Sequence, residues 1–242
     1  MRDNNIMNTA MNKIDTIIFD LDGTLLYTLD DLLCSVNYAL EKHHYPLRTI
    51  KEIRCFVGNG VRLLMRRALG MEKIGTIGEC DNPLRVIDDE EFEAIFADFT
   101  SHYLQHCNDR TRPYDGIMNL LKELYENQYK MAIVSNKADP AVKELNEIYF
   151  KDYIKVAKGE NESRGIGKKP APDMVFAALE ELESDTEHAI YVGDSEVDIA
   201  TANNSNLGIV VCTWGFRDED FLKEKGARLL ISKPMELIDV LK

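Results

Sequence analysis

Three short apolar runs, each ending in a polar residue, constrain the fold of this chain more than any other feature of its sequence. TIIFD ends at Asp20, KMAIVSN ends at Ser135 and Asn136, and HAIYVGD ends at Asp194. Runs of four to six residues that are rich in Ile and Val, and are bounded by turn residues, are typical of strands buried on both faces of a parallel sheet. We therefore expect three buried strands whose polar ends are exposed to ligands.

Helical patterns separate these runs, and two further runs, at 207–214 and 227–233, predict two more strands. Apolar residues recur at intervals of three and four after Gly116, after Pro140 and after Asp173, and Asp173 is expected to cap its helix. Alternation of strands and helices predicts a doubly wound α/β fold with a parallel sheet.

The segment from residue 28 to residue 109 breaks this alternation, because it shows helical periodicity and no strand of similar quality. Its three apolar stripes begin at Leu32 (with Val36 and Leu40), at Val61 (with Leu64, Ala68 and Leu69) and at Phe92 (with Ile95, Phe96, Phe99 and Tyr103). The sequence therefore predicts two domains, an α/β core built from residues 1–27 and 110–242 and an inserted α-helical cap at 28–109. Hinges are expected at 26–28 and 108–114.

Net charge and hydropathy limit the classes of molecule that the chain is expected to bind. It carries 42 Asp and Glu against 29 Lys and Arg, a net charge of −13, and a field of that sign repels nucleic acid and anionic membranes. No apolar run approaches the roughly 20 residues of a membrane helix, and residues 1–13 are too polar for a secretory signal. We expect a cytoplasmic protein, monomeric or homodimeric, that acts on a small molecule.

The polar strand ends predict a single site. Ligands bind open parallel sheets at the carboxyl ends of the strands, where the strand order reverses, so Asp20, Ser135 and Asp194 should meet there. Asp20 and Asp194, with the backbone carbonyl of Asp22, would offer oxygen ligands that suit Mg²⁺, and the ion would relieve the repulsion between the carboxylates. Asp198, one turn further on, is expected near the same ion, as a ligand or a partner of one, or else as a helix cap.

The paired aspartates also suggest a reaction. Asp20 is anionic at neutral pH and can attack phosphorus without a base, which would form an aspartyl phosphate that water can cleave. Asp22 could protonate the leaving alkoxide and later deprotonate the water. Gly23 is expected to turn the backbone so that amide hydrogens face phosphate oxygens, and Thr24 can contribute a hydroxyl.

Further along the chain, Ser135, Asn136 and a lysine are expected to bind the transferring phosphoryl group, which stays negative throughout the reaction. Lys169 rather than Lys168 is the expected lysine, because it abuts the first of the two prolines that restrain the backbone in KPAPD.

These residues resemble a known family. DLDGT at 20–24, IVSN at 133–136, KPAPD at 169–173 and GDSEVD at 193–198 are similar, in order, to the four motifs of the haloacid dehalogenase superfamily. The resemblance implies Mg²⁺-dependent phosphoryl transfer through an aspartyl phosphate, with Asp20 as nucleophile, the second aspartate of DLDGT as acid and base, and a helical cap over the site.

Two segments, 56–69 and 213–217, also look like parts of the phosphoglycolate phosphatases within that superfamily. By that likeness a cap loop of Gly58, Asn59, Gly60 and Arg62 faces the active site. Arg62 would meet a substrate carboxylate, although a solvated helix face is an equally common place for such an arginine. Phosphoglycolate is accordingly the first substrate to test.

Three other functions remain open at this stage. A phosphosugar mutase of the β-phosphoglucomutase type would use the same four motifs and return the phosphoryl group to its sugar, and a pyrophosphate or nucleotide phosphatase would differ only in substrate. A non-enzymatic phospho-receiver also presents acidic strand ends on a doubly wound sheet, but it would lack a helical cap. A calcium-binding loop is excluded, because Leu25 stands where such a loop requires glycine.

Overall fold

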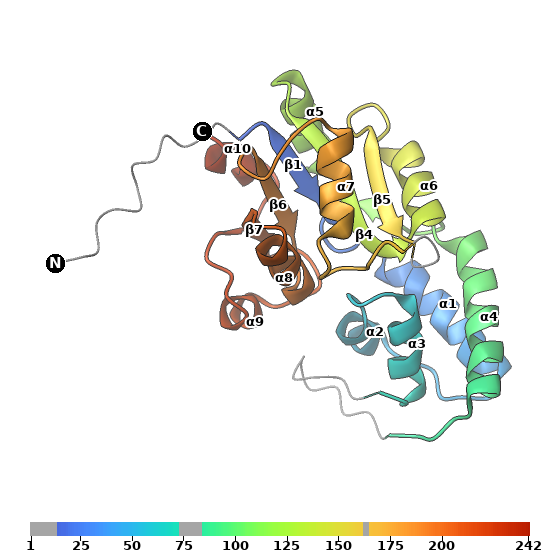
Figure 1. The fold of residues 1–242 in the computed structure, drawn as a ribbon. Helices are drawn as coiled ribbons and strands as arrows, with labels where there is room; N and C mark the ends of the chain where they lie inside the picture. The colour runs from blue at the N-terminus through green and yellow to red at the C-terminus, as the bar shows by residue number, and fades with distance from the viewer. Residues whose placement is uncertain (1–13, 73–83, 162–164) are drawn as a thin grey trace.

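The predicted buried strands lie side by side in one parallel sheet (Figure 1). The computed structural model describes residues 14–72, 84–161 and 165–242, so the polar segment 1–13 lies outside the described residues. The six strands run in the order β5-β4-β1-β6-β7-β8. Their bounds are β1 (Thr16–Phe19), β4 (Lys130–Ala138), β5 (Val156–Glu160), β6 (Ala189–Gly193), β7 (Gly208–Cys212) and β8 (Leu230–Ile231).

The strand order reverses at β1. From β1 the chain proceeds outward through β4 to β5, then returns to the other side of β1 and proceeds through β6 and β7 to β8. The carboxyl ends of β1, β4 and β6 therefore flank the point at which an open α/β sheet binds its ligands.

Helices cover both faces of the sheet, which confirms the doubly wound α/β fold. Ile17 and Phe19 of β1 share one apolar cluster with residues of α5 (Ile117–Glu126), α6 (Asp139–Tyr149) and α10 (Glu236–Val240). Ile18 faces the other way, toward α7 (Asp173–Glu181) and α8 (Glu196–Asn204). On the α8 side, Leu222 of α9 (Glu219–Glu224) packs with Ile199 and β7. The alternation along β1 produces the two faces, because successive side chains of a strand point in opposite directions.

Three local predictions differ from the structure. The strand β5 was not predicted, because VAKGE has few apolar residues and forms an edge of the sheet. The fifth predicted strand, at 227–233, is reduced to the two residues of β8. Asp173 does not cap α7; it is the first helical residue, and Pro172 occupies the N-cap position without a side-chain hydrogen bond.

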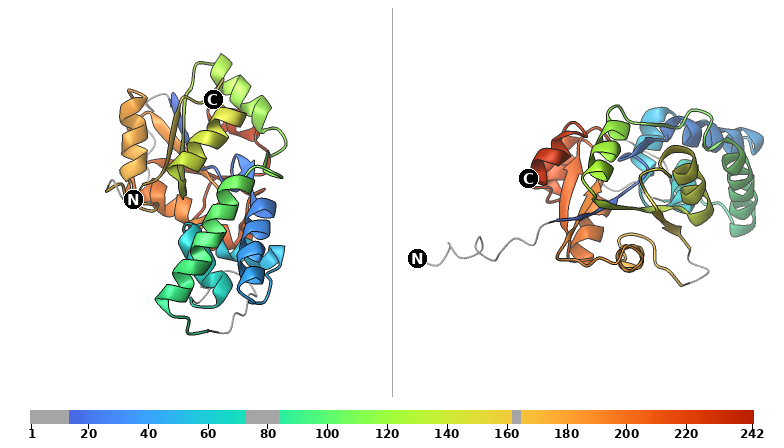
Figure 2. Two further views of the ribbon diagram at one scale, coloured as in Figure 1. Left: turned by 90° about the vertical axis from the view of Figure 1, so that its right-hand side faces the viewer. Right: turned by 90° about the horizontal axis from the view of Figure 1, so that it is seen from above.

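Between β2 and β3 the described residues form four helices that share a separate apolar cluster, and these helices are here named the helical unit. They are α1 (Leu29–Lys42), α2 (Ile50–Phe56), α3 (Val61–Leu69) and α4 (Asp89–His106). α2 begins with a capping box, in which the Thr49 side chain accepts from the Glu52 amide and the Glu52 side chain accepts from the Thr49 amide. The helical unit lies beyond one end of the sheet, next to the ends of β4 and β5 (Figures 1 and 2).

Both connections to the helical unit run side by side as a two-stranded antiparallel ribbon, β2 (Leu26–Tyr27) with β3 (Arg112–Pro113). The buried carboxylate of Asp31 fixes the second connection, because it accepts from the amides of Arg110 at 3.0 Å and Thr111 at 2.8 Å. The ribbon falls within the expected hinges. The division into a core and a cap domain stays a prediction.

None of the helices in the described part of the chain is both long and apolar enough to cross a bilayer.

Candidate active site

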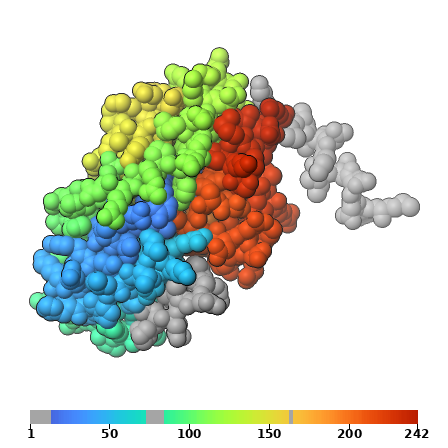
Figure 3. Space-filling model, turned by 180° about the vertical axis from the view of Figure 1, so that it is seen from behind, coloured from blue at the N-terminus to red at the C-terminus, as the bar shows by residue number. Residues whose placement is uncertain are grey.

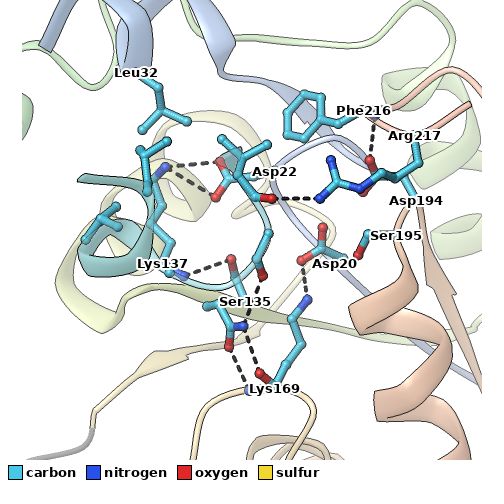
Figure 4. Close-up of a pocket in the computed structure, with 16 residues that line it drawn as sticks. Asp20, Asp22, Leu32, Ser135, Lys137, Lys169, Asp194, Ser195, Phe216 and Arg217 are labelled. Atoms are coloured by element: carbon cyan, nitrogen blue, oxygen red, sulfur yellow. Dashed lines mark hydrogen bonds and ion pairs between the residues drawn. The ribbon is translucent and has the colours of Figure 1, made fainter. Parts of the chain in front are cut away.

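A pocket lies at the carboxyl edge of the sheet, and two walls of different character enclose it (Figure 4). The core wall is polar and comes from the strand ends and the loop before α7: Asp20, Asp22, Ser135, Lys137, Lys169 and Asp194. The helical wall comes from α1, α3 and the loop between α2 and α3: Leu32, Val57, Gly58, Gly60, Val61 and Leu64. The structure thus brings Asp20, Ser135 and Asp194 together at one edge, as the sequence predicts.

Three buried carboxylates lie close together at this edge of the sheet, and two of them, Asp20 and Asp194, line the pocket. Oxygens of Asp20, Asp194 and Asp198 lie within 4.8 Å of one another. Burial, and then the neighbouring Asp198, raise the pKa of Asp194 from 3.8 to about 7. Burial likewise raises the pKa of Asp20 well above its usual value, and Asp198 and Asp194 add to this, although Lys169 opposes it. Oxygen ligands that are crowded and short of positive charge fit a hard divalent cation such as Mg²⁺.

Lys169 is the cation nearest these carboxylates. Its Nζ donates to Asp20 Oδ1 at 2.5 Å and to Asp198 Oδ1 at 2.8 Å (Figure 4 shows the first contact). Burial alone would lower the pKa of Lys169, but Asp198 and Asp20 raise it well above the usual value. Asp20 Oδ2 receives no hydrogen bond from the described residues, so Lys169 binds one oxygen of Asp20 and leaves the other available.

Asn136 holds the backbone of Lys169 rather than lying free for a phosphate. Its Oδ1 accepts from the Lys169 amide at 2.7 Å, and its Nδ2 donates to the Lys169 carbonyl at 3.0 Å and to the Gly58 carbonyl at 3.3 Å. This pair of bonds places the lysine at the end of β4 without help from a regular element.

Asp198 is saturated by donors from its own neighbourhood. Its Oδ2 accepts from the amides of Asp194 and Ser195 and from the Ser195 hydroxyl, and it completes a capping box at the start of α8. Its Oδ1 accepts from Lys169 and from the Tyr191 hydroxyl at 3.2 Å. A carboxylate has about four lone-pair sites, so this arrangement favours Asp198 as helix cap and holder of Lys169 over a direct metal ligand.

Asp194 is oriented by groups from two loops. Its Oδ1 accepts from the Thr24 hydroxyl at 3.3 Å and its Oδ2 accepts from the Phe216 amide at 2.6 Å. A Cβ added at Gly23 or at Gly215 would come within 2.4 Å of Asp194 Oδ2. Both glycines are therefore required by the close approach of this carboxylate.

The roles predicted for Gly23 and Thr24 differ from what is seen. The Gly23 amide donates to the Leu26 carbonyl at 2.9 Å instead of facing a phosphate, and the fully buried Thr24 hydroxyl serves Asp194. These residues shape the Asp194 side of the site, because the tight turn after Asp22 directs them away from the pocket.

The side chain of Asp22 is paired with a second buried lysine. Lys137 Nζ donates to Asp22 Oδ1 at 3.0 Å and also to the hydroxyl of Tyr103, which comes from α4 of the helical unit (Figure 4 shows the contact with Asp22). Burial alone would lower the pKa of Lys137, but Asp22 and Tyr103 raise it above the usual value. The Asp22 side chain lies outside the three-carboxylate group, and the expectation that its backbone carbonyl reaches a metal stays a prediction.

A reciprocal pair of arginines, here named the clasp, joins the helical unit to the loop after β7. Arg54 Nε donates to the Phe216 carbonyl at 2.6 Å. In return, Arg217 donates to the carbonyls of Arg54 at 2.9 Å and Val57 at 2.7 Å, and its Nε binds Glu196 at 2.8 Å. In space-filling view this boundary is where the blue and cyan helices meet the orange C-terminal part of the chain (Figure 3).

Comparison with known proteins decides the family. The sequence model of the haloacid dehalogenase-like hydrolase family matches residues 17–212. The chain belongs to this family. Its curated relatives include the phosphoglycolate phosphatase of Rhodobacter capsulatus, 35% identical over 203 residues, which cover 83% of this chain and 85% of the relative. They also include the N-acetylmuramic acid 6-phosphate phosphatase of Pseudomonas aeruginosa, 26% identical over 95% of both chains.

Comparison with solved structures supports the same family. A candidate phosphoglycolate phosphatase from Lactobacillus delbrueckii subsp. bulgaricus superimposes with a TM-score of 0.86 at 33% identity, covering 95% of this chain and 99% of that one. This member of the haloacid dehalogenase-like hydrolases is accordingly an enzyme of the phosphatase type.

Two residues that the resemblance placed at the substrate lie elsewhere in this hydrolase. The Arg62 side chain is 51% exposed, forms an ion pair with Glu93, and lies over the rings of Phe92 at 5.0 Å and Phe96 at 4.9 Å. Asn59 accepts from Arg67 at 3.1 Å. Neither lines the pocket, whereas Gly58 and Gly60 do. The α3 stripe of Val61 and Leu64 faces inward, so Arg62 is turned toward α4.

Sequence reasoning missed Lys137, Tyr103 and Arg217. Lys137 directly follows IVSN, and its place at a predicted strand end was a usable signal. Tyr103 gave none, since it reads as one more apolar position on its helix. Arg217 lies in a segment noted only for its resemblance, and the two backbone carbonyls that it binds are about 160 residues away in sequence.

Proposed function

We propose that this chain hydrolyses a small phosphate monoester, phosphoglycolate in the first place, through an aspartyl phosphate formed on Asp20 with the help of Mg²⁺. The observation that carries the proposal is the arrangement at the base of the pocket. Asp20 has one oxygen bound by Lys169 and the other without a donor among the described residues, and it lies beside Asp194 and Asp198. An anionic nucleophile next to a fixed cation suits attack on a phosphoryl group.

The substrate guess is supported by two of the relatives. Phosphoglycolate and N-acetylmuramic acid 6-phosphate, on which the named relatives act, are both monoesters whose alcohol part carries a carboxylate. A small carboxylated monoester is therefore the substrate class that we propose for this chain.

In the first half of the reaction, an oxygen of Asp20 attacks phosphorus and the bond from phosphorus to the ester oxygen breaks. Asp22 gives its proton to the departing alkoxide. In the second half, Asp22 takes a proton from water, the water oxygen attacks phosphorus, and inorganic phosphate and free Asp20 result. Lys169, held by Asn136 and Asp198, stays at the phosphoryl group throughout, and Ser135 offers a hydroxyl there.

The metal site in this scheme is formed by Asp20, Asp194 and the Asp22 carbonyl, with Asp198 holding Lys169. A bound Mg²⁺ would supply positive charge against the phosphoryl oxygens and against the crowded carboxylates.

A phosphate-release screen over small monoesters, with and without Mg²⁺, tests the proposal. We expect release that requires the metal, is stopped by a chelator, and falls at least about 10³-fold in Asp20→Asn. Asp239→Asn, an equal change at a site whose side chain is 77% exposed, is the matched control. Full turnover in Asp20→Asn would show that Asp20 is not the nucleophile. Faster phosphate release from a nucleotide or from pyrophosphate would replace the proposed substrate class. Isomerised sugar phosphate without free phosphate would indicate a phosphosugar mutase instead.

A further inference from the structure

We propose that Lys137 binds the carboxylate on the leaving group of the substrate, and that this contact gives the enzyme its preference for carboxylated phosphate monoesters. The inference rests on the proposed function, because it takes Asp20 and Asp22 in the roles given above. It assigns to Lys137 the part that the resemblance had assigned to Arg62.

Two separate pairs of lysine and aspartate divide the core wall. Lys169 is bound to Asp20, the residue that attacks phosphorus. Lys137 is bound to Asp22, the residue that protonates the ester oxygen. Lys169 is thus on the phosphoryl side of the bond that breaks, and Lys137 is on the side of the leaving group. In phosphoglycolate a single methylene separates the ester oxygen from the carboxylate, so that carboxylate has to lie close to Asp22 and its lysine.

One donor of Lys137 is only weakly engaged. An ammonium group carries three N–H donors. Asp22 Oδ1 accepts at 3.0 Å and the Tyr103 hydroxyl accepts as well, whereas the contact with Asp22 Oδ2 is long, at 3.4 Å. Lys137 lines the pocket although it is only 4% exposed. A buried ammonium group gains a stronger interaction when an anion takes the place of its weakest acceptor.

The other cations that line the pocket are held by partners away from Asp22. Lys169 is held between two carboxylates, and the three nitrogens of the Arg217 side chain donate to Glu196 and to two backbone carbonyls. The helical wall contributes no charged side chain from the residues that line it. A substrate carboxylate placed beside Asp22 would be repelled by it, and Lys137 is the cation in position to offset that repulsion.

Paired substrates separate this role from a purely structural one. Phosphoglycolate and ethyl phosphate have the same chain length, and only the first has a carboxylate. We expect Lys137→Met to lower the ratio of their kcat/KM values about 10-fold to 100-fold, mainly by raising KM for phosphoglycolate. Lys137→Arg, which keeps the charge, should recover part of the ratio. Arg62→Met should leave the ratio unchanged.

If Lys137 only positions Asp22, both substrates lose activity equally and the ratio stays constant, which would overturn the proposal. A fall of the same kcat/KM ratio in Arg62→Met but not in Lys137→Met would also overturn the proposal.

A binding experiment avoids both turnover and the risk that Lys137→Met does not fold. Calorimetric titration of Asp20→Asn in Mg²⁺ should show phosphoglycolate binding at least about 10-fold more tightly than ethyl phosphate. Equal affinities would overturn the inference and leave the phosphatase reaction untouched. Failure of the proposed function has a different signature, namely wild-type protein that releases no phosphate from any monoester.

Discussion

The two walls of the pocket are built on different physical principles. On the core wall, charged side chains lie at strand ends in a sheet that is buried on both faces. They are held by bonds to backbone amides or to other charges, as Asp194 is by the Phe216 amide and Lys169 by Asp20 and Asp198. The helical wall offers apolar side chains and two glycines from a unit with its own apolar cluster.

In the proposed reaction, the core wall carries out the chemistry and the helical wall selects the substrate. A reacting carboxylate has to stay in place to within a fraction of an ångström, and the strand ends of a packed sheet meet that demand. The helical unit is attached through a short ribbon, the clasp and contacts such as Lys137 with Tyr103. In the proposed reaction it would contribute shape, exclusion of water and the surroundings of the leaving group.

The largest effect is expected from the core wall, in Asp194→Asn. Phosphate release should fall at least about 100-fold, because the variant lacks a ligand of the proposed metal site. The metal-free variant should nevertheless be more stable than metal-free wild type at pH 8, since a buried charge has been removed.

The pH dependence of that stability follows from the pKa of Asp194, which is about 7 in the fold and 3.8 as its ordinary value. A raised pKa means that this group favours folding below pH 4 and that the contribution is lost as the pH rises through 7, on the order of a few kcal/mol. Thermal unfolding in a chelator at pH 5 and pH 8 measures it, and Mg²⁺ should restore more stability at pH 8. A melting temperature of Asp194→Asn below that of wild type at pH 8 would contradict this reading.

An intermediate effect is expected at the clasp, in Arg217→Met. The change leaves Glu196 and two carbonyls without their buried donor, so the free energy of unfolding should fall by about 3 kcal/mol, as measured by urea titration. The matched variant is Arg54→Met, whose side chain is 42% exposed, and it should cost about 1 kcal/mol. Equal losses in both variants would show that burial does not distinguish the two arginines.

The smallest effects are expected on the helical wall, where neighbouring residues of α3 form a matched pair. Val61→Ala should raise KM about 3-fold to 10-fold while kcat changes less than about 2-fold, because Val61 lines the pocket and touches no reacting group. Arg62→Ala should change neither constant by more than about 2-fold. Steady-state kinetics on one substrate measures both constants. A large fall of kcat in Val61→Ala would contradict the view that only the core wall acts on the reacting groups.

Much of the core wall could be predicted without coordinates. The strands β1, β4 and β6 follow from runs of Ile and Val, and the places of Asp20, Asp194 and Lys169 follow from the strand ends and from KPAPD. Each of these signals is contained in fewer than about ten consecutive residues, and parallel strands bring their carboxyl ends to a common edge whatever lies between them.

The helical wall could not be predicted in the same way. Whether Val61 or Arg62 faces the pocket depends on how α3 sits against α4, and a shift of one residue on a helix turns a side chain by about 100°. The pairing of Lys137 with Tyr103 joins positions 34 residues apart, and the Arg54 contact with Phe216 joins positions 162 apart.

What the amino-acid sequence determined by itself is the α/β class, the strands that end at the pocket and the charged residues at their carboxyl ends, because local periodicity and short motifs are enough to encode them. Tertiary structure alone decided which groups hold these residues: the side chains of Asp198 and Asn136 around Lys169, the Thr24 hydroxyl and the Phe216 amide around Asp194, and Lys137 beside Asp22. A buried charge is stabilised by whichever donors reach it when the core closes, and that choice depends on packing between segments that are distant along the chain.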